Sequence, residues 1–252
     1  MNPATVPATP KPGELDARGL TLAYDKLVVV EELDISITPG QITAIVGANA
    51  CGKSTLLRGL SRLLKPTTGT VHLNGHDVHR MKTKHVALQM GLLPQSNQSP
   101  SAITVADLIS RGRHPHQTWF AQWSAADEAA VTEAMRATRT TELADRSVDE
   151  LSGGQTQRVW IAMALAQETP IMLLDEPTTF LDMAHQVDVM DLLCELNATH
   201  GRTIVIVLHD LNQACRYAHD LVAMKHGHVI AQGAPSEVVT ESLVENVFGL
   251  KT

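Results

Sequence analysis

Hydrophobic positions along the chain change their spacing in a regular order, which predicts strands and helices in alternation. Residues 15–24 and 27–37 alternate between apolar and polar side chains or are β-branched, as is typical of strands. Residues 41–46 form a short apolar run, which favours a strand buried in the centre of a sheet. Apolar side chains then recur at helical spacing over residues 53–64.

The same alternation resumes on both sides of a central helical stretch. The predicted strands are 65–75, 85–95, 171–175 and 203–209, with a hairpin around Gly227. The predicted helices are 104–113, 124–138 and 153–167 in the central stretch, and 184–199 and 211–218 after it. Ser124, followed by Asp127, resembles a capping box. We therefore predict an α/β fold with a core of residues 14–95 and 168–252 and a helical subdomain over residues 96–167.

Composition narrows the classes of protein that fit this pattern. The formal net charge of −7 argues against a general nucleic-acid binder, which usually carries a basic face. The three cysteines have no CxxC or zinc-like spacing, so we expect reduced thiols. Residues 1–13 are rich in Pro, Thr and Ala and do not resemble a signal peptide, which predicts a mobile tail. No apolar run approaches the length of a membrane span, so a role at a membrane requires a partner protein.

The stretch GANACGKST carries the strongest chemical signal in the chain. Gly47, Gly52, Lys53 and Ser54 match GxxxxGK[ST] after a predicted strand and before a predicted helix, the context that this phosphate-binding motif requires. Small residues let backbone N–H groups turn inward around an anion, and the helix start adds further N–H groups. We expect Lys53 to reach the β- and γ-phosphates of a nucleotide and the Ser54 hydroxyl to bind Mg²⁺.

Two acidic residues follow the predicted strand 171–175. Asp175 at the strand end is suited to holding Mg²⁺ through water. Glu176 beside it is suited to orienting or deprotonating an attacking water, as a general base. The alternative is two solvated acids at a strand end. Because a phosphate loop needs a metal partner, we favour the functional interpretation.

A second glycine-rich stretch, LSGGQ over residues 151–155, precedes a predicted helix. Its serine and glycines can present a hydroxyl and bare amides to an anion, although a glycine turn with a serine N-cap explains the stretch equally well in isolation. Taken together and in this order, the motifs resemble those of the ATP-binding subunit of an ABC transporter. The resemblance covers about residues 15–250.

The resemblance implies roles for residues around the bound nucleotide. Tyr24 matches the aromatic residue that stacks on adenine, and Gln95 matches the glutamine that contacts Mg²⁺ and senses the permease. His209 matches the histidine near the γ-phosphate, next to the general base Glu176. The ATP-binding loop comprises Gly47, Ala48, Asn49, Ala50, Cys51, Gly52, Lys53, Ser54 and Thr55.

The resemblance also implies that two copies of the chain act together. Two subunits pair head to tail, so that the phosphate loop of one faces the LSGGQ signature of the other. The residues implied to contact the ATP of the second copy are Ser152, Gly153, Gly154, Gln155 and Asp182. The implied fold is a P-loop NTPase core with an antiparallel β subdomain and a helical subdomain that carries the signature. Its implied cofactors are ATP and Mg²⁺.

Segments around the helical stretch resemble one class of importer in particular. RGRHPHQ at 111–117 and HDLNQACRYA at 209–218 are similar to the ATPases of ferric-siderophore importers, most closely the ferric-enterobactin type. This implies a transmembrane permease, an indirect siderophore-binding protein, no nucleic acid, and a peripheral position on the cytoplasmic side of the inner membrane. A haem or cobalamin importer is the alternative. ATPases of this family that act in ribosome function or DNA repair fit less well, because they usually carry tandem units or long coiled coils.

The phosphate loop departs from the family's usual GPNGCGKST at two positions. Ala48 replaces proline and Ala50 replaces glycine. If the fourth position needs a positive φ, Ala50 is strained by about 1 kcal/mol, and ATP binding should survive. Thr156 replaces the arginine often found after the signature, which affects a surface contact. Cys51 lies within the loop, so we expect alkylation of its thiol to block ATP binding and bound ATP to protect the thiol.

Overall fold

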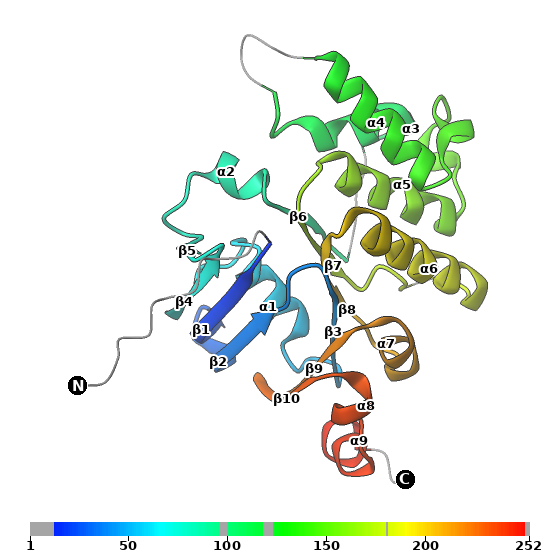
Figure 1. The fold of residues 1–252 in the computed structure, drawn as a ribbon. Helices are drawn as coiled ribbons and strands as arrows, with labels where there is room; N and C mark the ends of the chain where they lie inside the picture. Colours follow the sequence, from blue (N-terminus) through cyan, green and yellow to red (C-terminus); the bar gives the residue numbers. More distant parts are fainter. Residues whose placement is uncertain (1–12, 96–99, 118–122, 180, 250–252) are drawn as a thin grey trace.

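Two β-sheets lie on either side of one helix, α1 (Lys53–Leu60), in the computed structural model of the protein (Figure 1). The structure describes residues 13–95, 100–117, 123–179 and 181–249. The predicted mobile tail, residues 1–13, lies outside these residues apart from Gly13, whose N–H donates to Asn74 Oδ1 at 2.9 Å. No helix within the described ranges is both long and apolar enough to span a bilayer.

The larger sheet has six strands in the order β10-β9-β3-β8-β7-β6. Five are parallel: β3 (Ile42–Gly47), β6 (Met90–Leu93), β7 (Ile171–Asp175), β8 (Thr203–Val207) and β9 (Asp220–Lys225). The edge strand β10 (His228–Gly233) pairs antiparallel with β9, which gives the hairpin predicted around Gly227. The parallel arrangement brings the carboxyl ends of β3 and β7 to one edge of the sheet, where both predicted site segments begin.

The smaller sheet is antiparallel, in the order β2-β1-β4-β5. Its strands are β1 (Leu15–Tyr24), β2 (Leu27–Ile37), β4 (Thr68–Leu73) and β5 (His76–Asp77). Alternate apolar residues of β1 and β2 pack with α1 and with one face of the six-stranded sheet in a single buried cluster. Gly69, with φ +79°, allows β4 to approach β1, because a Cβ there would lie 2.2 Å from the Gly19 carbonyl oxygen.

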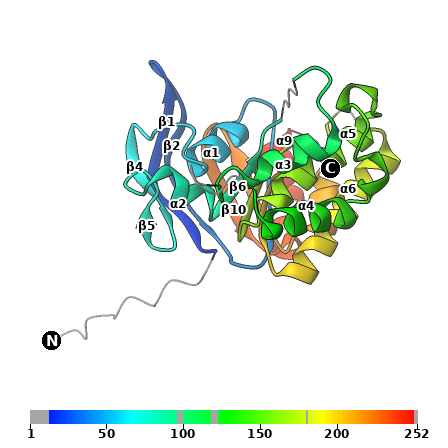
Figure 2. The same ribbon diagram turned by 90° about the horizontal axis from the view of Figure 1, so that it is seen from above.

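The other face of the six-stranded sheet is covered by helices. The central stretch contains α3 (Val105–Ser110), η1 (Arg111–Arg113), α4 (Ala125–Ala137), η2 (Thr141–Leu143), η3 (Val148–Glu150) and α5 (Gly153–Ala166). Later helices are α6 (Met183–His200), α7 (Leu211–Tyr217), α8 (Pro235–Val238) and α9 (Glu241–Phe248). Figure 2 shows the antiparallel sheet and helices α3 to α6 at opposite ends of the molecule. The boundaries predicted for a helical subdomain, at residues 96 and 167, stay a prediction.

One predicted strand is wrong in part. Residues 85–95 were expected to be a single strand, but the structure has helix α2 (Thr83–Ala87) followed by β6. Val86 and Met90 are both buried in the cluster beneath the antiparallel sheet, and their spacing of four fits a helical turn as well as an apolar run. Only residues 90–93 lie close enough to pair with β7.

Arg113 fastens the central helices together. The residue is 3% exposed, and its Nε donates to Asp127 Oδ1 at 2.8 Å. A terminal nitrogen donates to the Ala166 carbonyl at 2.7 Å and to Glu168 at 2.6 Å. Ser124 and Arg113 hold the pKa of the Asp127 carboxyl below its usual value, and Ser124 forms the predicted capping box with Asp127. A buried charge pair therefore joins η1, α4 and the end of α5.

Replacing Arg113 by Met should lower the free energy of unfolding by about 3 kcal/mol, because it leaves the buried Asp127 carboxylate without its cation. Urea denaturation followed by circular dichroism measures the change. The matched control is Arg136→Met on α4, which removes an exposed pair with Glu133 and should leave the midpoint unchanged. Equal shifts for the two variants would show that burial of the Arg113 pair contributes nothing to stability.

Candidate functional site

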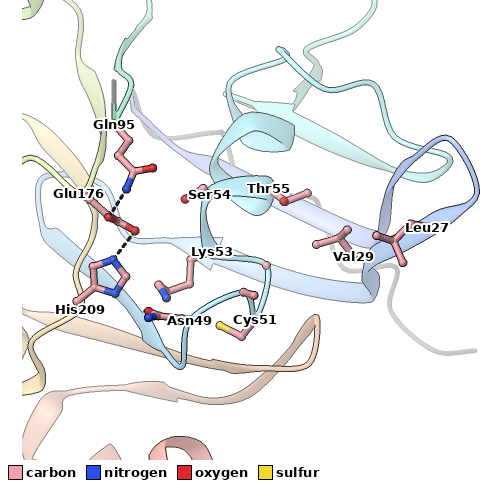
Figure 3. Close-up of a pocket in the computed structure, with 12 residues that line it drawn as sticks. Leu27, Val29, Asn49, Cys51, Lys53, Ser54, Thr55, Gln95, Glu176 and His209 are labelled. Atoms are coloured by element: carbon pink, nitrogen blue, oxygen red, sulfur yellow. Dashed lines mark hydrogen bonds and ion pairs between the residues drawn. The ribbon is translucent and has the colours of Figure 1, made fainter. Parts of the chain in front are cut away.

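A pocket of about 560 Å³ opens beside the phosphate loop, where β3 ends and α1 begins (Figure 3). Most of its lining residues are ones that the sequence predicts for the nucleotide site. The lining residues are Leu27, Val29, Asn49, Ala50, Cys51, Gly52, Lys53, Ser54, Thr55, Gln95, Glu176 and His209. The structure thus brings the loop, Gln95, Glu176 and His209 together from four separate parts of the chain.

The loop has the conformation that an anion-binding site needs. Gly47 has φ +154°, and a Cβ there would lie 2.3 Å from the Met224 carbonyl oxygen. Gly52 has φ +105° and caps α1. Lys53 donates from Nζ to the carbonyl oxygens of Gly47 and Ala48, both at 3.0 Å, so its ammonium lies over the loop. A cation and the first N–H groups of α1 are therefore directed at the same space.

Ala50 has φ +60°, so the condition for strain at the fourth loop position is met. An L-residue with a Cβ is disfavoured there by about 1 kcal/mol relative to glycine. Ala48 has a negative φ and is not strained in this way. The two departures from the usual loop therefore differ in their physical consequences.

Ser54 and Asp175 form a pair suited to a hard cation. The Ser54 hydroxyl donates to Asp175 Oδ1 at 2.8 Å. Burial raises the pKa of the Asp175 carboxyl. The hydrogen bond from Ser54 lowers this pKa and the charge of the neighbouring Glu176 raises it, but the pKa remains above its usual value. A divalent cation would offset both the burial of the Asp175 carboxylate and its repulsion by Glu176. Oxygen donors are the ligands that Mg²⁺ prefers.

The protein offers few ligands to such a cation. Within the described ranges there is no group of three or more His, Cys, Asp or Glu placed to bind a metal. Ser54, Asp175 and the Gln95 side chain therefore fit Mg²⁺ only as a partial set. Substrate phosphates and water complete the shell in sites of this kind.

Glu176 lies at the centre of a polar cluster. Figure 3 shows Gln95 and His209 converging on its carboxylate. Gln95 Nε2 donates to Oε2, His209 Nε2 lies 2.5 Å from Oε1, and Thr179 Oγ1 donates to Oε2 at 3.1 Å. The backbone of Glu176 has φ +52°, a strained conformation that these contacts hold in place. The cluster therefore fixes the orientation of the Glu176 carboxylate in the pocket that holds the phosphate loop.

Sequence reasoning missed Thr179. It lies three residues after Glu176, in a turn where the Thr179 N–H donates to the Glu176 carbonyl at 3.2 Å. A hydroxyl residue at that separation was the available signal, since a turn brings positions i and i+3 together.

Tyr24 is not one of the pocket-lining residues. Its hydroxyl accepts a hydrogen bond from Arg58 of α1 at 3.0 Å, and the side chain is 40% exposed. Leu27 and Val29 of the neighbouring strand β2 line the pocket instead, and sequence reasoning had not selected them. Their apolar character at the exposed end of the β1–β2 hairpin was the sequence feature that could have predicted this role. The stacking of Tyr24 on adenine stays a prediction.

Cys51 lines the pocket, although its side chain is largely buried. Its side chain is 5% exposed and belongs to the buried cluster around α1. A Cβ on Gly47 would lie 2.8 Å from its sulfur, which places the thiol beneath the loop. Burial also raises the pKa of the thiol, which lowers the thiolate fraction. Burial and the raised pKa both slow alkylation of the thiol. That alkylation of Cys51 blocks ATP binding, and that ATP protects the thiol, stay predictions.

The signature residues lie away from the pocket of their own chain. Ser152 caps α5, and its hydroxyl accepts from the Gln155 N–H at 3.3 Å while Gln155 Oε1 accepts from the Ser152 N–H at 3.0 Å. Asp182 caps α6 with a largely exposed carboxylate. None of the residues from Ser152 to Gln155, nor Asp182, lines the phosphate-loop pocket. Their predicted contact with the ATP of a second copy stays a prediction.

Replacing Ala50 by glycine should raise the free energy of unfolding by about 0.5–1 kcal/mol, since glycine adopts the positive φ without strain. The control is Ala48→Gly, which should lower it by a similar amount because glycine only adds freedom to the unfolded chain. Urea denaturation without nucleotide measures both. A loss of stability in both variants would show that Ala50 is not strained.

Comparison with known proteins places this site in a family. Residues 30–179 match the family model described as ABC transporter. The chain is 57% identical over 232 residues to the ferric enterobactin transport ATP-binding protein of Escherichia coli (strain K12), covering 92% of this chain and 86% of that protein. It is 55% identical over 236 residues to the achromobactin transport ATP-binding protein of Dickeya dadantii (strain 3937), covering 94% and 88%.

A solved structure shares the fold. It is a dimeric post-hydrolysis state of an ATP-binding cassette bound to ADP and phosphate, with a TM-score of 0.76 and 27% identity over 88% of this chain and 98% of that one. The predicted P-loop fold and the predicted resemblance are confirmed. The family model covers more than half of the 252 residues, and the two relatives cover more than nine-tenths of the chain. The chain therefore belongs to the ABC transporter family, as an ATP-binding subunit.

Proposed function

We propose that this chain is the ATP-hydrolysing subunit of an importer that carries an iron(III)-siderophore complex across the cytoplasmic membrane. One observation carries the ATPase part. The Ser54–Asp175 pair and the Glu176 carboxylate lie next to each other beside the ammonium of Lys53, at the edge of one pocket. This is the set of groups that phosphoryl transfer to water requires: a phosphate cradle, a place for a cation and a base.

The residues divide the work of hydrolysis between them. Backbone N–H groups of the loop and the Lys53 ammonium hold the β- and γ-phosphates, and Lys53 exchanges its two carbonyl partners for phosphate oxygens. Ser54, Asp175 and Gln95 hold Mg²⁺, which neutralises phosphate charge when bound. Glu176 orients a water and accepts its proton as the water oxygen bonds to the γ-phosphorus. The bond from the γ-phosphorus to the β–γ bridging oxygen breaks in the same displacement, so that ADP and phosphate leave. His209, already in contact with Glu176, faces the same region.

A second copy of the chain completes the site in this proposal. At the N-terminus of α5, Ser152 and Gly153 are exposed, Gln155 is half-buried and Gly154 is buried. Asp182 is also exposed, and none of these residues lines the pocket of its own chain. We infer that they contact the ATP held by the phosphate loop of the other copy. Closing and opening of the pair with ATP binding and hydrolysis would then form a two-state switch.

The substrate assignment is supported by the relatives. The names of the two relatives reported above specify ferric enterobactin and achromobactin transport. We infer that this chain works with a transmembrane permease and, indirectly, a siderophore-binding protein, as a peripheral subunit on the cytoplasmic side of the inner membrane. A haem or cobalamin importer is the second candidate.

Glu176→Gln should lower ATP turnover by about 100-fold or more, because the amide cannot accept the water's proton. ATP binding should be retained, since the loop is untouched. Lys53→Ala is the contrasting variant and should lose ATP binding itself, because it removes the cation that pairs with the phosphates. Steady-state phosphate release and equilibrium binding of a fluorescent ATP analogue separate the two effects. Near-normal hydrolysis by Glu176→Gln would remove Glu176 from the role of base.

The substrate is tested by growth. A strain lacking this chain should fail to grow on single ferric siderophores as iron source, while growing normally on ferrous iron. The wild-type chain should restore growth, and the Glu176→Gln variant should not. Restoration of growth only on haem, or of cobalamin-dependent growth, would replace the siderophore assignment and leave the ATPase assignment standing.

A further inference from the structure

The first turn of α6 holds the exposed carboxylate of Asp182 in place. His185, one turn further along, contacts the same carboxylate oxygen twice: its backbone N–H donates to Asp182 Oδ1 at 2.9 Å, and its ring Nδ1 lies 2.6 Å from that oxygen. The backbone bond is an ordinary N-cap. The ring contact is additional, and it fixes the Asp182 side chain in one orientation.

The chemistry of this pair determines the direction of the ring hydrogen bond. An ionised carboxylate only accepts, so Nδ1 carries the hydrogen and donates. The two bonds from His185 hold the pKa of Asp182 below its usual value. Both bonds use Oδ1. The side chain is 65% exposed, so Oδ2 can accept a further bond from another molecule.

The other side of the His185 ring contacts the signature. A Cβ on Gly154 would lie 2.4 Å from Cδ2 and 2.9 Å from Cγ of the ring, so the imidazole packs directly on the Gly154 backbone. At Gly153 a Cβ would lie 3.6 Å from Leu181, which is ordinary contact. Of the two signature glycines, Gly154 is therefore the one that His185 requires.

Gln186, the residue after His185, connects the first turn of α6 to helix α7. Gln186 donates to the Leu181 carbonyl at 3.0 Å and accepts from Gln213 Nε2 at 2.6 Å. Gln213 lies in α7, which begins directly after the segment that carries His209. The first turn of α6 therefore touches the signature, Asp182 and the helix that follows His209.

From these contacts we propose that His185 is a positioning residue for the nucleotide site of the second copy. It holds Asp182 and the N-terminus of the signature helix α5 as one unit, so that both reach the partner's ATP in a fixed relation. The inference rests on the proposed function, because it takes these two segments to be the ones that contact that ATP. Fixing them in advance lowers the conformational entropy lost when two copies close on ATP.

The contacts separate two roles of the ring, and variants can remove them one at a time. His185→Ala removes both the hydrogen bond and the packing on Gly154. His185→Asn keeps a donor at the position of Nδ1, and His185→Phe keeps a flat ring without a donor. His200→Ala is the matched control, since it removes an exposed histidine from the last turn of the same helix.

The experiment measures ATP-driven dimerisation of the full chain in a Glu176→Gln background, where bound ATP persists. Sedimentation velocity with saturating Mg-ATP gives the dimer dissociation constant, and a fluorescent ATP analogue at low protein concentration gives the affinity of the monomer. His185→Ala and His185→Phe should weaken dimerisation by about tenfold or more, with monomer affinity unchanged within about twofold. His185→Asn keeps the donor to Asp182 but loses the packing on Gly154, so it should restore only part of the loss, and His200→Ala should have no effect.

The outcomes distinguish this inference from the proposed function. Dimerisation of His185→Ala equal to that of the parent would overturn the role of His185 alone. A loss of monomer ATP affinity equal to the loss of dimerisation would also overturn it, because His185 would then support the fold of its own pocket. A parent that binds ATP and stays monomeric would overturn both the inference and the contact with a second copy. A parent that binds no ATP would overturn the proposed function itself.

Discussion

At the end of β3, the backbone of Gly47 lies so close to strand β9 that no side chain fits between them. The rest of the site depends on this close contact. A Cβ there would lie 2.3 Å from the Met224 carbonyl oxygen and 2.8 Å from the Cys51 sulfur. The turn of the β9–β10 hairpin braces the loop, because the Gly227 N–H donates to the Cys51 carbonyl at 2.9 Å. The chain can therefore reverse into α1 immediately after the sheet. Its free N–H groups and the Lys53 ammonium then face one concave space.

The register of the parallel strands brings the acidic residues at the end of β7 to the phosphate loop. Because β7 pairs with β8 and β8 with β3, the end of β7 comes level with the start of α1, and Asp175 meets Ser54 across 121 residues of sequence. Glu176, the next residue, leaves the strand in a strained conformation. Gln95, Thr179 and His209 compensate by contacting its carboxylate. Strain held by several contacts at a reactive group is typical of a preorganised site.

The sequence predicts many of these strands and loops correctly. The apolar runs predicted β3, β7 and β8, and the glycines with Lys53 and Ser54 predicted the phosphate loop, because these signals are local. The part that failed was also local: residues 85–95 carry one apolar run, yet Val86 packs from a helix and Met90 begins a strand. Cys51 and Tyr24 show what position in the sequence leaves open. The sequence predicts both in the nucleotide site, and the structure adds that the Cys51 side chain is largely buried and that the Tyr24 hydroxyl pairs with Arg58.

The sequence by itself determined the family, the phosphate loop and the acids at the end of β7, since each depends on residue types at short fixed spacing. Only the tertiary structure decided which side chains share a cavity and which backbone positions exclude a Cβ. It gave Ala50 a positive φ, put Leu27 and Val29 on the pocket wall, and laid the His185 ring on Gly154. The physical reason is that these contacts join residues through strand register and helix packing. No spacing within a single segment encodes them.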